Sequence, residues 1–370
     1  MRKTRLRVGF TTGSASAAGA KAGIIFLIKG KVVKEVDIPT PVGKRLVIPI
    51  DSICGISPHK AVVKVIKDGG DDPDATHGAC IKVIVELMRE VAGEKRIDIR
   101  GGRGVGIVTR RGLPVSIGEP AINPHPRRQI MDAALEAFKE VDREDLRVRI
   151  TIEVEDGEKI ARKTLNPRLG ILGGISILGT RGTVIPFSAR AYKDTISLAM
   201  QVARDSGAEY VGLSTGGRSE RLLREMLGHW REEAFVQIAD FFRFSIEEAI
   251  AKGFRGVCFS VFPGKLIKMA QGHPYTHARK SRIDFSLLSS WAREKGISPE
   301  RCLLISRANT AREVMEIIRE EPLREVFLED LTYRSWRVAQ GFVGDATLSI
   351  TYYVFDYDEN FILKVGDEHL

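Results

Sequence analysis

Residues 210–220, YVGLSTGGRSE, join an apolar run to a glycine-rich turn and then to the start of a helical pattern. The run predicts a strand at 210–213, and the pattern after the turn predicts a helix at 219–227. A glycine-rich turn between a strand and a helix lets backbone approach a nucleotide closely. The stretch therefore indicates an α/β domain with a candidate ligand crevice at the carboxyl end of this strand.

Strands and helices alternate on both sides of this stretch. Such alternation is typical of parallel βαβ units, so we expect a Rossmann-like domain with a mostly parallel sheet. A further strand is expected at 348–354, either in this domain or returning to the first one. The other predicted helices are 191–205, 246–252, 265–270, 286–295 and 311–320, and the other predicted strands are 235–239, 256–261 and 303–306.

The first half of the chain has a different rhythm. Most of its predicted strands alternate apolar and polar residues, as at 147–154, which suits a sheet with one wet face. One helix is predicted at 129–141, so we expect an α+β domain with a mixed or antiparallel sheet. The 370 residues exceed one usual core, and we place two domains at 1–190 and 191–370. The remaining predicted strands are 31–38, 45–50, 61–67, 79–85 and 97–100.

The chain opens on a second glycine-containing turn, GFTTGSASAAGAKAG at 9–23. Ser14 is a reasonable N-cap and Gly30 a reasonable C′ residue for a helix that is buried along much of its length. Thr11, Thr12 and Gly13 would place hydroxyls and unpaired N–H groups at the helix start, which suits an anion. Residue spacing alone favours a tightly packed core helix with an ordinary cap over an anion-binding helix start.

The net charge of the chain indicates which kinds of partner it could bind. The 57 Lys and Arg against 48 Asp and Glu give a net charge of +9, which favours an acidic partner. The basic residues are spread along the chain, so a nucleic-acid groove is not favoured. Asn and Gln are rare among many charged residues, which suggests a thermophilic source.

Cysteines and apolar runs exclude other classes. The four cysteines have no C-x-x-C spacing, so neither a zinc site nor a disulfide framework is indicated. The apolar run at 24–28 is too short to span a bilayer, and no signal-like region follows the first residues. We therefore expect a cytoplasmic protein without a membrane partner and without a metal site of its own.

The glycine-rich turn of the second domain supplies the candidate nucleoside site. A carboxylate at Asp240, 23 positions after Gly217, could accept hydrogen bonds from ribose hydroxyls. The glycines do not spell G-x-G-x-x-G, so a plain tight turn and a helix-capping Asp240 stay equally open. His273 and His277 are separated by Pro274, which argues against a helical metal site.

The acidic segment DGGDDPDATHG, residues 68–78, is the candidate for chemistry in the first domain. Four carboxylates in seven residues repel one another unless they meet cations or N–H groups. Asp71, Asp72 and His77 could orient a substrate and take a proton, whereas the alternative is a solvated turn. The segment lacks the EF-hand register.

The proline-stiffened segment EPAINPHPRR, residues 119–128, ends at a helix start. Arg127 and Arg128 could clamp a carboxylate or a phosphate in fork geometry. A rigid linker with surface arginines is equally compatible with the pattern.

Together these segments resemble the cobalt-precorrin-5B C1-methyltransferases of anaerobic cobalamin biosynthesis, the CbiD type. Cys is usual in that family where Ala15 stands here, and His125 and Asp240 also depart from its pattern. The matching segments occur in the family's order, at 9–13, 68–78, 101–106, 118–126, 166–179, 214–220 and 263–268.

The resemblance implies methyl transfer from S-adenosylmethionine to a ring carbon of a cobalt-containing tetrapyrrole. The cobalt would arrive inside the substrate. The resemblance also implies that the second domain binds S-adenosylmethionine and that the first domain binds the corrinoid. Asp71, Asp72 and His77 would be the candidate acid or base groups. The implied cofactor residues are Ser214, Thr215, Gly216, Gly217, Glu220 and Asp240, and those for substrate carboxylates are Thr11, Thr12, Gly13, Asn123, Arg127 and Arg128.

Two other functions stay as alternatives. Glycine-rich loops also serve ATP in phosphotransferases, but G-x-x-x-x-G-K-[ST] is absent. An RNA-binding protein would fit the basic charge, yet no strand carries exposed aromatics beside basic residues. The sequence is compatible with a homo-oligomer.

Overall fold

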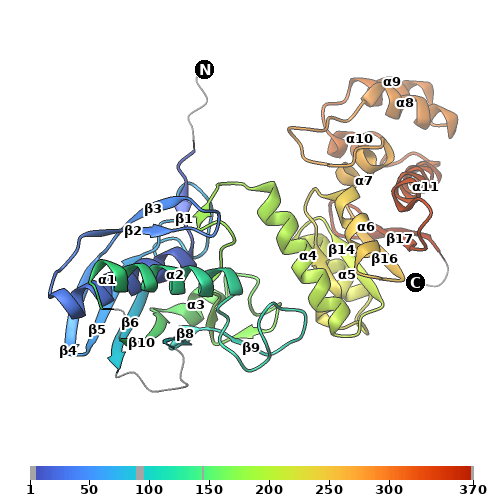
Figure 1. The fold of residues 1–370 in the computed structure, drawn as a ribbon. Helices are drawn as coiled ribbons and strands as arrows, with labels where there is room; N and C mark the ends of the chain where they lie inside the picture. Colours follow the sequence, from blue (N-terminus) through green and yellow to red (C-terminus); the bar gives the residue numbers. More distant parts are fainter. Residues whose placement is uncertain (1–5, 89–95, 144–145, 368–370) are drawn as a thin grey trace. The chain divides into compact units, whose positions relative to one another are not determined.

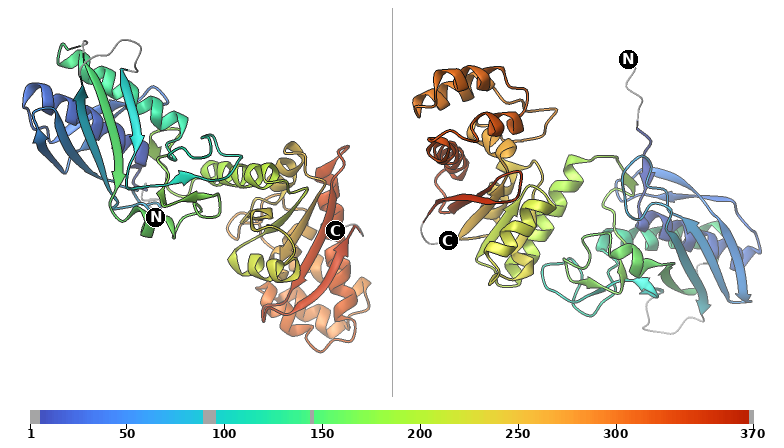
Figure 2. Two further views of the ribbon diagram at one scale, coloured as in Figure 1. Left: turned by 90° about the horizontal axis from the view of Figure 1, so that it is seen from below. Right: turned by 180° about the vertical axis from the view of Figure 1, so that it is seen from behind.

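The structure is a computed structural model that describes residues 6–88, 96–143 and 146–367. The chain forms two compact units, Met1–Ser188 and Ala189–Leu370. Figures 1 and 2 show each unit as a sheet with helices packed against it. Within the described residues, no helix is long and apolar enough to cross a lipid bilayer.

The first unit is built from strands and three helices within its described residues. In chain order its elements are β1 (Gly9–Phe10), α1 (Thr12–Lys29), β2 (Glu35–Pro39), β3 (Arg45–Pro49), β4 (Ser52–Ser57), β5 (Lys60–Ile66), β6 (Cys80–Met88), β7 (Ile97–Gly101), β8 (Gly104–Val105), β9 (Ile107–Val108), α2 (Pro124–Glu140), β10 (Arg147–Val154), α3 (Gly157–Ala161), β11 (Ile171–Leu172), β12 (Gly174–Ile175) and β13 (Thr183–Val184).

The main sheet of this unit has the strand order β4-β5-β6-β10-β7. Neighbouring strands are antiparallel except β10 and β7, so the sheet is mixed. The alternating apolar residues of β5 and β10 belong to one core with residues of α1 and α2. Figure 1 shows both helices packed along this sheet. β4 was not expected from the sequence, because it is a largely exposed edge strand without apolar alternation.

Glycines let α1 approach the sheet closely. A Cβ atom added at Gly19 would lie 2.5 Å from Val83 Cγ2, and one added at Gly23 would lie 2.5 Å from Val85 Cγ2. Both valines belong to β6. The small-residue series of the opening therefore allows a helix to pack directly on a strand, which is a packing reason for its composition.

The second unit alternates strands and helices and ends in a strand pair. Its elements are α4 (Ala189–Asp205), β14 (Tyr210–Ser214), α5 (Gly217–Met226), a 3-10 turn η1 (Glu232–Ala234), β15 (Phe235–Gln237), α6 (Phe242–Ala251), β16 (Gly256–Val261), α7 (Pro263–Ala270), α8 (Phe285–Glu294), α9 (Pro299–Arg307), α10 (Ala311–Ile317), α11 (Arg324–Val343), β17 (Ser349–Phe355) and β18 (Phe361–Gly366).

The sheet of the second unit has the order β15-β14-β16-β17-β18. The first four strands are parallel and β18 is antiparallel at the edge, so this sheet is mixed as well. The strand expected at 348–354 therefore stays in this unit, between β16 and β18. Two units with mixed sheets confirm the coarse expectation, whereas the Rossmann-like relationship remains a prediction.

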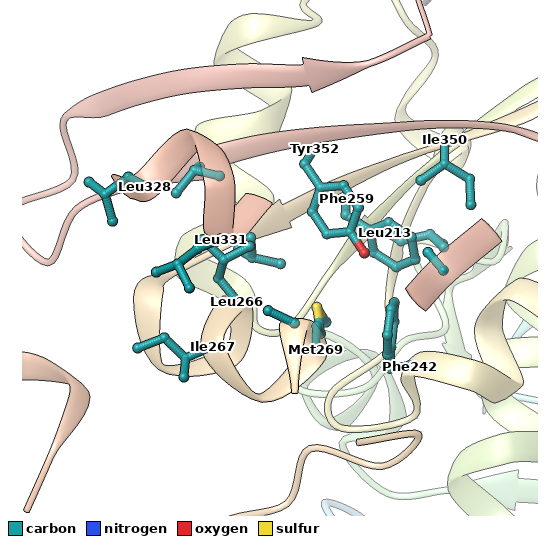
Figure 3. Packing of buried hydrophobic residues seen from close by; sticks show 14 of the residues in the cluster. Leu213, Phe242, Phe259, Leu266, Ile267, Met269, Leu328, Leu331, Ile350 and Tyr352 are labelled. Carbon is teal, nitrogen blue, oxygen red and sulfur yellow. The ribbon is translucent and has the colours of Figure 1, made fainter. Parts of the chain in front are cut away.

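The two faces of this sheet carry cores of unequal size. Phe259 and Tyr352 stack at 5.0 Å between ring centroids on the larger face, where α6, α7 and α11 pack (Figure 3). On the other face, Cys258 and Tyr353 belong to a small cluster that also contains Leu223 of α5. Successive residues of β16 and β17 thus enter opposite cores, as the two-residue period of a strand requires.

Two expectations for the second unit fail. Residues 303–306 belong to helix α9 rather than to a strand, because Pro299 starts a helix whose buried residues Cys302 and Ile305 lie three apart. Helix α11 was not expected at all. Its buried residues recur at helical spacing, but polar and aromatic side chains between them obscure the pattern.

Candidate functional site

The candidate site lies where parallel strands of the second unit end together. Because β14, β15, β16 and β17 run in the same direction, the turns that follow them share one edge of the sheet. In open α/β sheets ligands bind outside the carboxyl ends of the strands. The residues of these turns are therefore the ones to consider for a ligand.

The turn between β14 and α5 leaves room beside its backbone. A Cβ atom added at Gly216 would meet nothing within 4 Å, and one added at Gly217 would meet only Gln237 Nε2, at 3.9 Å. Gly216 has an extended φ of 177° that any residue adopts. The turn therefore needs no glycine-only conformation at Gly216, and the space beside its backbone is open at the carboxyl edge of the sheet.

Hydrogen bonds hold this turn in place from beneath. The Gly216 N–H donates to Ser219 Oγ at 3.2 Å, and Ser219 Oγ donates to the Gly216 carbonyl at 3.0 Å. Ser260 Oγ, on β16, donates to the Ser219 carbonyl at 2.6 Å. The first turn of α5 is thereby fixed to the sheet, which preorganises the space above the glycines.

The predicted cofactor residues separate into two layers. Thr215, Gly216 and Gly217 lie at the surface of the turn. Ser214 and Glu220 are buried: Ser214 Oγ lies 3.5 Å from the Val236 carbonyl, and Glu220 accepts a hydrogen bond from Gln237 Nε2. The first layer can touch a ligand directly, while the second supports it.

Asp240 follows β15 and is bound by two neighbouring segments. Its carboxylate accepts hydrogen bonds from the Lys265 ammonium and, at 3.2 Å, from Thr276 Oγ1. Burial, and then the charge of Asp240, raise the pKa of both Tyr192 and Tyr275. Asp240 is therefore an ion-paired carboxylate at the edge of an aromatic surface.

A pair of aromatic rings borders the same edge and was not expected from the sequence. Phe262 and Tyr357 stack with ring centroids 6.3 Å apart and an interplanar angle of 8°. The Arg218 guanidinium lies 5.2 Å from the Phe262 ring, and both Arg218 and Arg221 pair with Glu359. Tyr357 and Glu359 follow β17, whose place in the sheet could not be read from the sequence, whereas Phe262 follows β16 and the two arginines belong to α5.

The opening helix differs from the expected anion site. Thr11, and not Ser14, is the N-cap, and it is buried together with Thr12. Thr12 Oγ1 accepts from the Leu178 N–H at 2.9 Å, the Gly13 N–H donates to the Leu178 carbonyl at 3.2 Å, and Ser14 Oγ donates to the Gly182 carbonyl at 2.7 Å. Residues 176–182 thus bond to this helix start within the unit, and an anion-binding role for it stays a prediction.

The acidic segment 68–78 is largely bonded to its surroundings. The Asp71 carboxylate accepts from the Arg7 N–H at 2.6 Å, and the Asp72 carboxylate from the Phe187 N–H at 2.9 Å. Asp74 pairs with the buried Lys67, and Asp68 with Arg7. Cations and N–H groups therefore explain how these carboxylates lie close together.

His77 has a defined hydrogen-bond role. Its Nδ1 accepts from the Gly69 N–H at 3.0 Å. A neutral imidazole that accepts at Nδ1 carries its proton on Nε2. The half-exposed ring can therefore offer a donor at Nε2, whereas its acceptor atom is used inside the segment.

The arginines of the segment 119–128 do not form a fork for one anion in this structure. Arg127 donates to the Ile99 carbonyl at 3.2 Å, and Arg128 pairs with Asp132 one helical turn on. Asn123 is the N-cap of α2 but makes no side-chain capping bond. Among the described residues, no group of three or more His, Cys, Asp or Glu could hold a metal ion.

Comparisons with known proteins cover most of the chain. Residues 1–186 match the family model CbiD, and residues 275–366 match the model of the CbiD C-terminal domain. Curated relatives named cobalt-precorrin-5B C(1)-methyltransferase include those of Geobacillus sp. (strain WCH70), 45% identical over 86% of each chain, and of Nitratidesulfovibrio vulgaris, 42% identical over 95% of this chain and 91% of the relative.

A more distant relative with the same name comes from Leptospira borgpetersenii and is 38% identical over 98% of this chain and 96% of its own. A solved structure, the cobalamin biosynthesis protein (cbiD) from Archaeoglobus fulgidus, shares 28% sequence identity. It matches 70% of this chain and 78% of that chain at a TM-score of 0.38.

Proposed function

The chain belongs to the CbiD family, and from this premise we propose that it is a cobalt-precorrin-5B C(1)-methyltransferase that takes its methyl group from S-adenosylmethionine. The substrate would be a corrinoid whose carboxylates suit a chain with a net charge of +9. The proposal assigns the methyl donor to the carboxyl edge of the sheet in the second unit.

The open turn at Gly216 and Gly217 carries this assignment. Added side chains there would enter unfilled space, so the backbone can approach a ligand directly. Thr215 can contact the nucleoside, while Ser214 and Glu220 support the turn from below. Asp240 is proposed as a ribose neighbour, held in place by Lys265 and Thr276.

The protein contributes positioning and electrostatics. When bound, S-adenosylmethionine supplies an electrophilic methyl group on a sulfonium. The residues of the turn would hold the donor in line with the acceptor carbon, and fixed geometry of this kind lowers the barrier to a displacement. The hydrogen bonds through Ser219 and Ser260 keep that geometry before the ligand arrives.

Methylation at a ring carbon also requires a group that accepts the proton the macrocycle loses. Asp71 and Asp72 remain the proposed residues for this step, and His77 is proposed to orient the substrate beside them. The carboxylates of Asp71 and Asp72 each have a second oxygen besides the one bonded to a backbone N–H. His77, with its proton at Nε2, is better suited to donate a hydrogen bond to a substrate carboxylate. Thr11, Thr12, Gly13, Asn123, Arg127 and Arg128 stay proposed as the residues that bind the carboxylates of the corrinoid.

A calorimetric titration with S-adenosylmethionine tests the donor site. The change Gly216→Leu should weaken binding at least about tenfold, because a leucine would fill the space that the donor needs. Gly341→Leu is the matched control, since Gly341 is exposed on α11 and a Cβ atom there also meets nothing. Unchanged binding in the Gly216 variant, or no binding by the unaltered protein, would remove the assignment.

A further inference from the structure

Four aromatic rings form a continuous row on the second unit, and we call them the ring row: Tyr192, Phe241, Tyr275 and His277. Tyr192 and Phe241 stack at 5.5 Å between centroids, and Phe241 and Tyr275 approach to 4.9 Å. Tyr275 and His277 stack at 5.8 Å with an interplanar angle of 6°. The rings come from α4, from the turn before α6 and from the loop after α7, so the row exists only in the folded unit.

The row is accessible on one side. Phe241 is 7% exposed and forms its floor, whereas Tyr192 is 38% exposed and Tyr275 and His277 are partly exposed. Thr276, between the last two rings, is buried and donates its N–H to the Asp240 carbonyl at 3.0 Å. This bond fixes the loop that presents Tyr275 and His277, so the row is preformed, as two stacked pairs of rings whose planes are inclined by 50° between Phe241 and Tyr275.

Lysines surround the ring row. Lys193 Nζ lies 5.9 Å from the Phe241 ring centroid and 4.7 Å from that of Phe244, and Lys280 Nζ lies 5.5 Å from that of Tyr275. Lys268 Nζ donates to the Thr276 carbonyl at 3.1 Å. Burial, followed by the charge of Lys265, lowers the pKa of Lys268, as expected where cations gather.

Little negative charge balances these lysines. Residues 262–283 contain no Asp or Glu, and Asp240 is already paired with Lys265. Arg243, on the first turn of α6, pairs with Glu247. The surface therefore combines partly exposed aromatic rings with a surplus of positive charge, which suits a conjugated ligand that carries carboxylates at its rim.

We propose that the ring row, with Lys193 and Lys280 at its sides, binds the face and the carboxylate rim of the tetrapyrrole substrate. This inference rests on the proposed function and adds a substrate surface on the second unit, whereas the sequence assigned the corrinoid to the first. Asp240 joins the ring row to the proposed donor site, so the acceptor ring and the methyl donor would lie on the same edge of one unit.

Single-stranded nucleic acid is the other ligand that stacks on rings among cations. The location favours the tetrapyrrole. Asp240, which is also proposed as a neighbour of the methyl donor, bonds to Thr276 between two rings of the row, and a substrate that accepts the methyl group must lie next to its donor. An oligonucleotide has no such requirement, and it therefore enters the test as a competing outcome.

The test is a fluorescence titration of the full-length protein with uroporphyrin III, a planar tetrapyrrole with a carboxylate rim. Tyr275→Ala and the double variant Lys193→Glu/Lys280→Glu should each weaken binding about tenfold. Tyr333→Ala is the matched aromatic control, because Tyr333 is also exposed and stacked, on Trp336. Arg307→Glu/Arg337→Glu is the matched charge control, on exposed positions of α9 and α11.

Two further measurements keep the outcomes distinct. Circular dichroism shows whether each variant is folded, and titration with S-adenosylmethionine reports the donor site independently of the ring row. Failure of donor binding in the unaltered protein would count against the proposed function alone. The inference is overturned if the unaltered protein does not bind uroporphyrin, if the ring-row variants bind it like the controls, or if an oligouridylate displaces it at equal concentration.

Discussion

The carboxylate of Asp72 accepts a hydrogen bond from the backbone N–H of Phe187, with 2.9 Å between Oδ1 and N. Phe187 has a φ of 53°, which is uncommon for a bulky residue, and its side chain is 71% exposed. Phe187 also immediately precedes the last residue of the first unit. The acidic segment thus holds the end of this unit in an unusual backbone conformation.

Exchanging Asp72 separates a hydrogen-bonding role from a proton-accepting one. Asp72→Ala removes the bond to Phe187 and should lower stability by about 1 kcal/mol. Asp72→Asn keeps an oxygen acceptor and should keep most of that stability, which chemical denaturation would measure. If Asp72 also accepts the substrate proton, methyl transfer falls in both variants; activity in Asp72→Asn close to that of the unaltered protein would exclude that role.

The cap of α1 gives a second prediction. Thr11 Oγ1 accepts from the Ser14 N–H at 3.2 Å, so Thr11→Ala should destabilise the first unit by about 1 kcal/mol, whereas Thr11→Ser should be nearly neutral. Thermal unfolding followed by circular dichroism would compare them. A direct anion-binding role predicts instead a loss of substrate affinity in Thr11→Ala without a change in stability.

A bulkier residue at Gly13 should act through packing. A Cβ atom there would lie 2.9 Å from Pro126 Cβ, so even Gly13→Ala must displace the start of α2 or of α1. We expect a loss of about 1–3 kcal/mol in stability, with activity falling in parallel as folded protein is lost. Full stability together with lost activity would show that Gly13 faces a ligand.

The Lys67–Asp74 ion pair predicts acid sensitivity. Burial by itself would raise the pKa of Asp74, but hydrogen bonds from Lys67 and Thr76 outweigh it, and the pKa lies below its usual value. Because folding lowers the pKa of Asp74, the ion pair contributes its full stabilisation above the pKa that Asp74 has in the unfolded chain, near pH 4. This contribution is lost as the pH falls through the lower pKa that Asp74 has in the folded protein. Urea midpoints measured from pH 7 down to pH 3 would show this loss.

Substitution of Asp74 isolates the same pair. Lys67 is only 2% exposed, so Asp74→Ala leaves a buried ammonium without its carboxylate and should cost about 3–5 kcal/mol. Lys67→Met/Asp74→Ala removes both charges and should recover much of that loss, and it should abolish the acid dependence assigned to the pair. Equal stability of the single and double variants would contradict the pairing.

Features that depend on near neighbours in the chain could be predicted from the sequence, whereas features that depend on distant contacts could not. The helix at the opening, its end at Gly30, strand β16 and the change of rhythm near residue 190 could be predicted, because capping, alternation and glycine turns act between near neighbours in the chain. Helices α9 and α11 could not, since their apolar faces are selected by the core they contact.

The family, the glycine-rich turn after β14 and the positive charge of the chain all follow from the order of the amino acids. Tertiary structure alone decided that residues 176–182 cover Thr12, that Asp240 is paired with Lys265, and that rings from three separate segments form one row. Contacts between residues far apart in the chain produce no recognisable pattern of residue spacing in the sequence. They arise only when the sheet brings the ends of its strands to one edge.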